Sequence, residues 1–221
     1  MNLAELKRRI EENSRRWNEG EDLLERNRPW PKRRIEILIG DITKQEVGVI
    51  VNAANTGLVP GEGVDGAITR VAGPKALADR ERIIAERGTP PLPTGEAVVG
   101  TGGDLPARWI VYTAGPIYSG KDRDRRQLRD CYVASLRAAA TVGAHSIAFP
   151  AISCGIYGYP AEEAAPIALS AVMHEDIGPE DVHIVLFDES LKVIFTHALS
   201  VEVQRHRWGI DELGRWFSPG Y

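Results

Sequence analysis

Strand-like runs alternate with helical patterns along most of this chain of 221 residues, and this alternation restricts the folds open to it. Apolar runs rich in β-branched residues predict strands at 35–39, 47–52, 97–101, 109–114, 146–150 and 182–187. Helical patterns predict helices at 67–87, 125–142, 161–176 and 190–203, the first of them broken near Gly73 and Pro74. This order predicts an α/β fold whose mixed or parallel sheet is covered by helices on both faces.

Segments of different composition flank the alternating core. Apolar residues along one helical stripe of residues 1–18 predict a helix that packs on the domain. We therefore expect an N-terminal helical extension and connector at 1–33, one α/β domain at 34–200, and a tail at 201–221. The tail is rich in aromatic residues, and we expect it to pack on the domain.

The net charge and the cysteine content limit the class of protein. A formal net charge of −4 provides no general attraction to nucleic acid or to an anionic membrane, although it does not exclude a nucleic-acid partner. Cys131 and Cys154 lack the spacing of a metal site or a disulfide framework, and the five histidines lack ligand spacing. No apolar run approaches the ~18 residues of a transmembrane helix, and no signal peptide is evident. We expect a cytoplasmic protein without metal or cofactor, with a monomer as the simplest oligomeric state.

Residues 47–66 combine an apolar strand with polar groups and a glycine-rich turn. Asn52 and Asn55 supply amide donors and acceptors near the end of the strand, and the chain contains no asparagine after Asn55. Glycines let backbone N–H groups approach an anion closely, and this turn contains Gly57, Gly61, Gly63 and Gly66. Asp65 lies where a helix should begin. The combination predicts a site for a phosphorylated sugar.

The same turn also matches the dinucleotide-binding pattern G-x-G-x-x-G at 61–66. That fold needs the first glycine directly after the strand, and an acidic residue at the end of the next strand about 20 residues on. Here the strand pattern stops near Asn52, and the acidic residues at that distance, Asp79 and Glu81, lie in a predicted helix. The NAD-binding fold is therefore disfavoured.

Other candidate binding loops follow predicted strands, where the ligands of such sheets bind. Residues 40–43 follow the first strand, and residues 115–116 follow the fourth. The fifth strand runs into residues 153–158, where Gly155 and Gly158 give backbone freedom and Ser153 offers a hydroxyl. Such a loop suits a diphosphate held by main-chain donors, with Tyr157 placed to cover a sugar.

Four motifs occur in order along the chain: GDIT at 40–43, VNAAN at 51–55, GVDGAI at 63–68 and FPAISCGIYGYP at 149–160. Through these motifs the chain resembles a macrodomain of the MacroD type from about residue 34 to residue 200. The segments PTGEA at 93–97 and AGP at 114–116 agree as well.

The resemblance implies a three-layer α/β/α fold with a central mixed sheet of about six strands. It also implies binding of ADP-ribose and, in this branch, hydrolysis of mono-ADP-ribose from acidic side chains or deacetylation of O-acetyl-ADP-ribose. The implied partners are ADP-ribose and either ADP-ribosylated protein or O-acetyl-ADP-ribose, and no metal is required. A non-catalytic reader of ADP-ribose is the main alternative, and a hydrolase acting on ADP-ribosylated nucleic acid is a further one.

The resemblance also implies roles for single residues. Asp41 would accept the adenine amino group with Ile42 adjacent, and Phe187 would stack on adenine. Asn52 and Asn55 would lie by the distal ribose, where Asp65 would orient or activate the attacking water. The expected catalytic residues are Asn55 and Asp65. The expected ligand-binding residues are Asp41, Ile42, Asn52, Gly61, Gly63, Val64, Ser153, Cys154, Gly155, Ile156, Tyr157 and Phe187.

The chain departs from the MacroD pattern at four positions. A run of four glycines is replaced by residues 60–63, in which Pro60 removes a donor and Glu62 adds a negative charge. At about 4 Å from a ligand charge the repulsion would be about 1 kcal/mol in water and about 4 kcal/mol at an effective dielectric of 20, so we expect Glu62 to point outward. Tyr112 replaces a common histidine, and Cys154 replaces a frequent threonine. We expect Cys154 to be a buried thiol and not a nucleophile.

Overall fold

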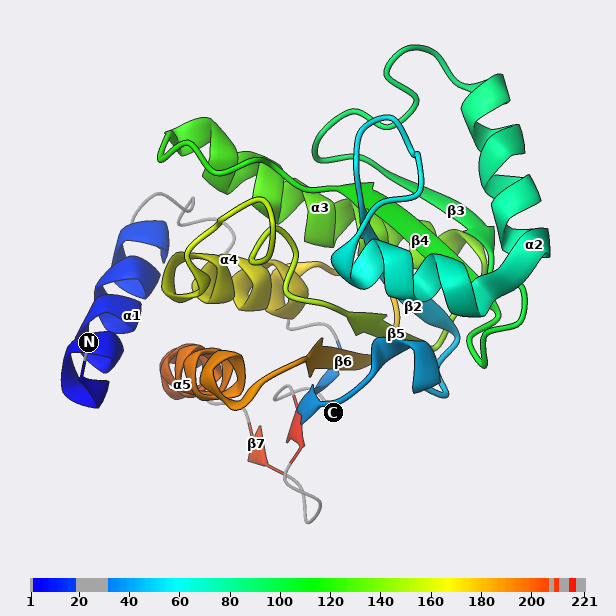
Figure 1. Ribbon diagram of the computed structural model, residues 1–221. Coiled ribbons are helices and arrows are strands. Elements are labelled where there is room, and N and C mark those ends of the chain that lie inside the picture. The colour runs from blue at the N-terminus through cyan, green and yellow to red at the C-terminus, as the bar shows by residue number, and fades with distance from the viewer. Residues whose placement is uncertain (1, 19–31, 207–208, 211–214, 218–221) are drawn as a thin grey trace.

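The computed structural model describes residues 2–18, 32–206, 209–210 and 215–217. Its strands form one sheet in the order β3-β4-β2-β5-β6-β1-β8-β7 (Figure 1). The six longer strands are β1 (Arg34–Ile39), β2 (Val49–Ala54), β3 (Ala97–Thr101), β4 (Trp109–Ala114), β5 (Ser146–Phe149) and β6 (Asp181–Leu186). Two short strands from the C-terminal segment, β7 (Gly209–Ile210) and β8 (Trp216–Phe217), extend the sheet beyond β1.

The strand directions bring the carboxyl ends of five strands to one edge. Strands β4, β2, β5, β6 and β1 run parallel to one another. Strand β3 pairs antiparallel with β4, and β8 pairs antiparallel with β1. The predicted mixed sheet is therefore confirmed, and its parallel part supplies the edge where ligands of such sheets bind.

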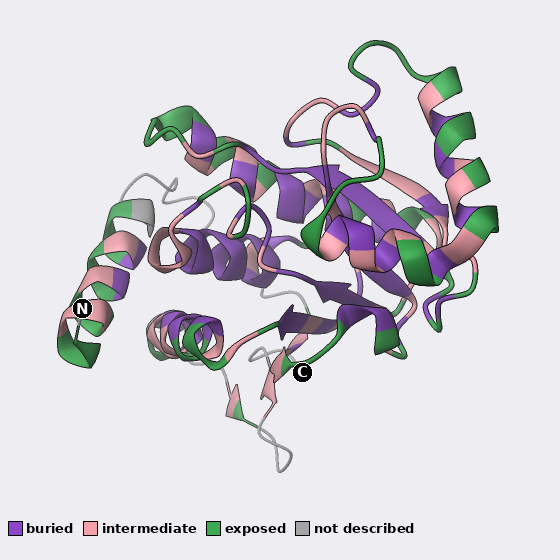
Figure 2. Cartoon of the chain, viewed as in Figure 1, coloured by how far each residue is buried: buried purple, intermediate pink, exposed green. Residues whose placement is uncertain are grey.

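Helices cover both faces of the sheet. They are α1 (Leu3–Asn18), α2 (Gly63–Glu86), α3 (Asp122–Thr141), α4 (Ala161–His174) and α5 (Glu189–His206), together with the short 3-10 helix η2 (Ile42–Lys44). Side chains from α3, α4 and α5 share one core with one face of the sheet, whereas α2 shares a second core with the other face. Figure 2 shows both buried layers in purple. The three-layer α/β/α architecture is confirmed.

The side chains of β2 alternate between the two faces of the sheet, so this one strand contributes to both cores. Val49 and Val51 are buried among the α3 and α4 side chains, whereas Ile50 and Ala54 are buried on the α2 side. Asn52 is two residues from both Ile50 and Ala54, so its side chain lies on the same face of the strand and also faces α2. The strand continues to Ala54, two residues beyond the predicted end, so Asn52 lies inside the strand and not at its end.

Helix α2 differs from the prediction at its start and agrees with it at its break. It begins at Gly63, earlier than the predicted residue 67, because the segment 63–66 is helical despite its two glycines. Asp65 is therefore in the first turn, and Glu62 occupies the N-cap position without a side-chain capping bond. Gly73 has φ +73° and ψ −171°, which divides the helix where the sequence predicted a break.

The N-terminal helix α1 packs against α4 and α5. Its buried Ser14 donates a hydrogen bond of 2.7 Å to Oε1 of the buried Glu202 in α5. At the opposite end of the chain, Trp216 of β8 packs against the core that contains α5. Within the described residues, none of the helices combines the length and the apolar character that a bilayer crossing requires.

Candidate active site

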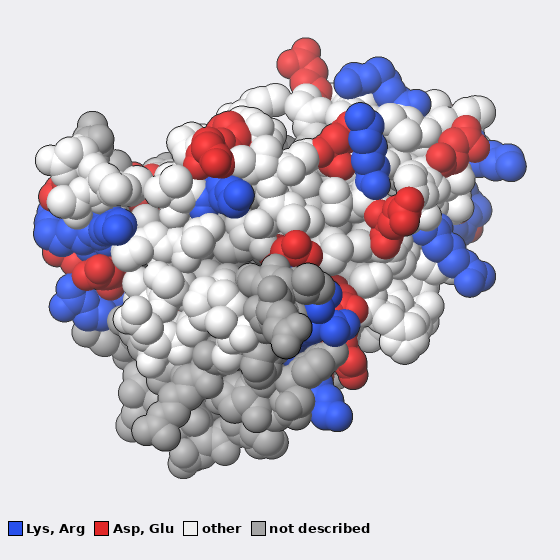
Figure 3. All heavy atoms as spheres, turned by 90° about the horizontal axis from the view of Figure 1, so that it is seen from below, with Lys and Arg blue, Asp and Glu red and all other residues white. Residues whose placement is uncertain are grey.

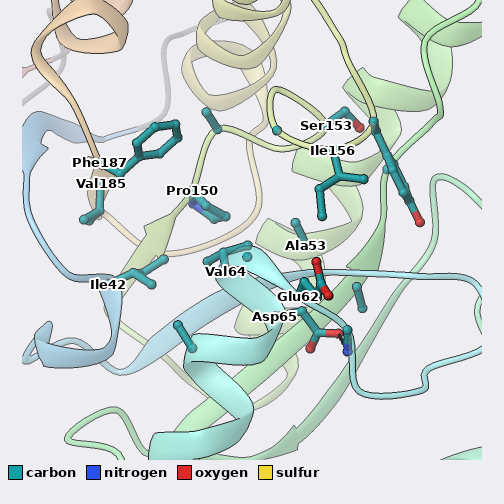
Figure 4. A pocket seen from close by; sticks show the side chains of 18 of the residues that line it. Ile42, Ala53, Glu62, Val64, Asp65, Pro150, Ser153, Ile156, Val185 and Phe187 are labelled. Atoms are coloured by element: carbon teal, nitrogen blue, oxygen red, sulfur yellow. Dashed lines mark hydrogen bonds between the residues drawn. The ribbon is translucent and has the colours of Figure 1, made fainter.

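A cavity of about 710 Å³ lies at the carboxyl ends of the parallel strands. This volume falls within the range of about 300–1,000 Å³ that is typical of small-molecule sites. Figure 4 shows Phe187, Val185 and Ile42 at one end and Glu62 and Asp65 at the other. The lining residues are Gly40, Asp41, Ile42, Ala53, Ala54, Asn55, Gly61, Glu62, Gly63, Val64, Asp65, Ala67, Gly115, Pro150, Ala151, Ser153, Gly155, Ile156, Tyr157, Val185 and Phe187.

One end of the cavity is apolar and open. Ile42 and Val185 are buried in its wall, whereas the ring of Phe187 is 73% exposed at the end of β6. Asp41 stands beside them as the N-cap of η2, and its Oδ1 accepts hydrogen bonds from the hydroxyl and the N–H of Thr43 at 2.7 and 2.9 Å. The Thr43 hydroxyl bond lowers the pKa of Asp41, which keeps this carboxylate ionised as an acceptor.

The middle of the cavity is bounded by the turn that follows β5. Among the described residues, no acceptor is hydrogen-bonded to the N–H groups of Gly155, Ile156 and Tyr157, so three successive donors are available. Ser153 has φ +66°, and its buried Oγ is likewise without a partner in the described part of the chain. The loop after β4 approaches so closely that a Cβ on Gly115 would collide with this oxygen. Successive free N–H groups of this kind form an anion-binding concavity.

The other end of the cavity is built around the buried carboxylate of Asp65. Its Oδ1 accepts hydrogen bonds from Nδ2 of Asn52 at 2.7 Å and from Nη1 of Arg80 at 2.8 Å. Its Oδ2 accepts hydrogen bonds from the N–H of Gly61 at 2.8 Å and from Nη2 of Arg80 at 3.1 Å. The hydroxyl of Thr69 donates a longer bond of 3.3 Å to Oδ1.

Asn55 closes the loop above this carboxylate. Its Nδ2 donates to the carbonyl of Val59 at 2.7 Å, and its Oδ1 accepts from the N–H of Val59 at 3.2 Å. The carbonyl of Asn55 accepts from the N–H of Leu58 at 3.0 Å, and Leu58 has φ +53°. These bonds fold residues 55–59 into a tight turn whose first residue lines the cavity.

Comparison with known proteins identifies the family. The family model of the Macro domain matches residues 51–168, which is more than half of the chain. The chain belongs to the macrodomain family. Expectations that rested on resemblance to this family are thereby confirmed for the fold and for membership.

Two curated relatives and one solved structure illustrate how close this macrodomain is to others. A "Macro domain-containing protein in non 5'region" of Streptomyces griseus is 51% identical over 168 residues, which covers 76% of this chain and 95% of the relative. A protein of Klebsiella pneumoniae named O-acetyl-ADP-ribose deacetylase is 47% identical over 169 residues, covering 75% and 95%. A single-residue variant of the Oceanobacillus iheyensis macrodomain, solved with ADPR, superposes with a TM-score of 0.72 at 41% identity, covering 77% and 94%.

All of the predicted site residues of this macrodomain except Asn52 and Cys154 line the cavity. Asn52 is completely buried in β2 beneath the cavity, and its amide nitrogen contacts Asp65, so it supports the site and does not line it. Cys154 places its Sγ 3.6 Å from the carbonyl of Ile152, and burial raises the pKa of its thiol to about 12. A thiol with this pKa is protonated at neutral pH, in agreement with its expected inert role.

The glycine-rich turn differs in one respect from the expectation. Gly61 lines the cavity, but its N–H is bonded to Asp65 and is not available to an anion. Among the described residues, free N–H donors lie in the turn at 155–157 and also at Gly63 and Val64 in the first turn of α2. Glu62 was expected to point outward; it is exposed, but it lines the rim of the cavity, so its charge is not directed fully away from the site (Figure 4).

Sequence reasoning missed Arg80 as a supporting residue of the macrodomain site, and it singled out Tyr112 only as a departure from the family pattern. Arg80 is buried in α2 and forms an ion pair with Asp65. Its guanidinium carbon lies 5.0 Å from the ring centroid of the buried Tyr112, and burial raises the pKa of this phenol to about 12. The phenol is therefore neutral at physiological pH and supports Arg80 through its ring. The sequence did contain a signal for Arg80, because this arginine occupies one of the otherwise apolar positions of the predicted helix.

Proposed function

We propose that this protein binds ADP-ribose in the cavity and hydrolyses esters at its distal ribose. The substrates would be mono-ADP-ribose attached to acidic side chains of proteins, O-acetyl-ADP-ribose, or both. The observation that carries the proposal is the order of three chemically distinct zones along one cavity: an apolar open end, a row of free backbone donors, and a buried carboxylate.

The three zones match the adenine, the diphosphate and the distal ribose of ADP-ribose, in that order. Adenine would stack on the exposed ring of Phe187 beside Ile42, and its amino group would donate to Asp41. The diphosphate would accept from the N–H groups in the turn at 155–157. The distal ribose would then reach Asn55 and Asp65 at the far end.

The reaction proposed at that end is attack of water on the ester. Asn55 and Asp65 would position the distal ribose and orient or activate the water. For an ester of an acidic side chain, water would attack the anomeric carbon, so that the new oxygen stays on ADP-ribose and the side-chain carboxylate leaves. For O-acetyl-ADP-ribose, water would attack the acetyl carbonyl, so that acetate forms and the ribose oxygen leaves and takes up a proton. The name of the Klebsiella pneumoniae relative, O-acetyl-ADP-ribose deacetylase, supports this reaction class at 47% identity. The ADPR in the Oceanobacillus iheyensis structure supports the ligand.

We further propose that residues 34–200 form the ligand-binding unit and that the segments on either side stabilise it from the back. All lining residues fall between Gly40 and Phe187, whereas α1 contacts α4 and α5. Among the described side chains on the face drawn in Figure 3, acidic and basic residues are interspersed, without a broad basic surface of the kind that binds nucleic acid. This favours ADP-ribosylated protein or a metabolite as the partner.

A non-catalytic reader is the second candidate. Glu62 stands at the rim of the cavity, where its charge would repel an anionic ligand or product, and the adjacent Pro60 stiffens the loop. Both features are compatible with binding that is not followed by turnover.

The test is release of ADP-ribose from a protein that carries ester-linked mono-ADP-ribose, with calorimetric ADP-ribose binding on the same samples. The proposal expects release by the wild-type protein and its loss in Asp65→Ala while binding persists. Tight binding without release by the wild type would make the protein a reader. Equal release by both proteins would remove Asp65 from the mechanism.

A further inference from the structure

We propose that Arg80 is a positioning residue, which holds the Asp65 carboxylate and the loop at 55–61 in the geometry required for turnover. This inference rests on the proposed function and decides how Asp65 acts within it. Asp65 and Arg80 would orient the reacting groups by fixing the wall of the cavity, and Asp65 would not take a proton from water.

The guanidinium of Arg80 is fully used. An arginine carries five N–H donors in a rigid planar fork, and each of the five has an acceptor here. Nε donates to the carbonyl of Leu58 at 2.7 Å, and Nη2 donates to the carbonyl of Val59 at 2.9 Å. The remaining donors bond both oxygens of Asp65 and, at 3.2 Å, the hydroxyl of Thr69. One side chain therefore joins α2 to two carbonyls of the loop.

The carboxylate of Asp65 is equally saturated. An ionised carboxylate has about four lone-pair sites, whereas Asp65 already accepts from five donors. A sixth donor such as the attacking water would have to displace one of them. The carboxylate is thus well placed to hold Gly61 and poorly placed to act as a general base.

Because the ion pair of Arg80 and Asp65 is buried, its main effect is to fix the geometry of the site, and it adds little to the stability of the fold. The side chains of Arg80 and Asp65 are only 2% and 4% exposed. Desolvation of two charges largely cancels their attraction, so apolar side chains of similar volume would be about as stable. What apolar side chains cannot provide is a fixed direction for each hydrogen bond. Because Val59 is also bonded to Asn55, the fork of Arg80 controls both ends of the turn that lines the cavity.

The experiment compares Arg80→Lys with the wild type and with Arg82→Lys as a matched control. Arg82 lies on the same helix and is ion-paired with Asp79 and Glu86, but it is 55% exposed and does not line the cavity. Lysine keeps the charge and lacks the fork. The readouts are kcat and KM for ADP-ribose release, the Kd for ADP-ribose, and hydrogen exchange of the peptide amides in residues 55–62.

For Arg80→Lys we expect kcat to fall by about 10- to 100-fold with KM and Kd within about threefold, because displacement of reacting groups costs turnover more than binding. We expect amide exchange in residues 55–62 to accelerate by at least about tenfold, with protection in the central strands unchanged. Arg82→Lys should change neither. In Asp65→Asn an amide nitrogen replaces one carboxylate oxygen, and this nitrogen cannot accept hydrogen bonds from Gly61 and Arg80. We therefore expect faster amide exchange in residues 55–62 of this variant as well.

Unchanged exchange in residues 55–62 in both Arg80→Lys and Asp65→Asn would overturn the proposal. Faster exchange throughout the protein with parallel loss of ADP-ribose binding would also overturn it, because Arg80 would then be a structural residue only. If the wild-type protein binds ADP-ribose but liberates none from the modified protein, the hydrolase proposal fails and with it the link to turnover. Faster amide exchange in residues 55–62 of Arg80→Lys would then still show that Arg80 holds this loop, since that measurement needs no activity.

Discussion

The two ends of the cavity differ in how they hold a ligand. At the open end, an exposed aromatic ring and two buried aliphatic side chains offer apolar contact, with Asp41 as the polar group among them. At the closed end, Asp65 and its partners form a buried network in which most polar atoms are already paired. The difference leads us to expect that affinity depends mainly on the open end and turnover mainly on the closed end, because the closed end has the larger network of hydrogen bonds.

The largest effect is expected from Asp65→Ala, which removes the centre of the closed end. Turnover should fall more than about 100-fold, whereas the Kd for ADP-ribose should stay within about tenfold, or about 1.4 kcal/mol. The buried charge of Arg80 would lose its partner, so the free energy of unfolding should also fall by about 3–5 kcal/mol. Steady-state kinetics, calorimetry and thermal melting of one preparation measure all three.

A Kd raised much more than tenfold in a folded Asp65→Ala protein would break the assignment of affinity to the open end. Asp65→Asn is the variant to compare with Asp65→Ala, because asparagine preserves the shape of the aspartate side chain. It should lower turnover with a smaller loss of stability, because the amide oxygen can still accept from Arg80.

The next effect is expected from Phe187→Ala at the open end. Loss of stacking on adenine should weaken ADP-ribose binding by about two- to tenfold, consistent with about 0.5–1.5 kcal/mol for an aromatic pair, and should leave kcat unchanged at saturation. Ile117→Ala is the matched control, since Ile117 is 70% exposed and does not line the cavity. A fall in kcat with an unchanged Kd would show that the two ends are not separable.

A smaller effect is expected from Glu62→Gln at the rim of the closed end. Removal of the negative charge should tighten ADP-ribose binding by up to about fivefold at low salt, or about 1 kcal/mol, and the gain should shrink as salt screens the charge. Glu81→Gln changes the net charge equally from an exposed position of α2 away from the cavity. Equal gains in both variants would mean that only the overall charge matters and that the rim position has no role.

The smallest effect is expected at Cys154, which lies in the turn that follows β5 but outside the cavity lining. Because burial raises the pKa of its thiol to about 12, the neutral form persists at every pH below that value. Turnover should therefore show no rise between pH 7 and pH 10 that depends on Cys154, and Cys154→Ser should stay within about twofold of the wild type. Rapid inactivation by iodoacetamide at pH 8, absent in Cys154→Ser, would contradict this.

Much of the fold could be predicted because its signals are local. Apolar runs and helical periodicity located all six longer strands and all five α-helices, and the Gly73-Pro74 pair located the break in α2. The strands β7 and β8 escaped prediction because two residues are too few for a pattern. The start of α2 was placed too late because glycines are poor helix formers even where the tertiary structure imposes a helix.

The site could be predicted wherever a motif follows a strand, and its supporting residues could not. Arg80 is 15 residues beyond Asp65, and on a straight helix they would be separated by about 22 Å. The positive φ of Gly73 turns the second half of α2, which brings the guanidinium back to the carboxylate. Asn52 was misplaced for a related reason: its side chain lies under the cavity because of strand parity, which requires the register of β2 to be known.

The close approach of Gly115 to Ser153 has a consequence for how such sequences can diverge. Any side chain at position 115 would collide with the hydroxyl of Ser153 in the turn that follows β5, and with Ile152 beside it. A substitution at 115 therefore requires that the side chains at 152 and 153 change or that the turn moves. In descendants of this chain we expect glycine at 115 to be lost only together with such a change.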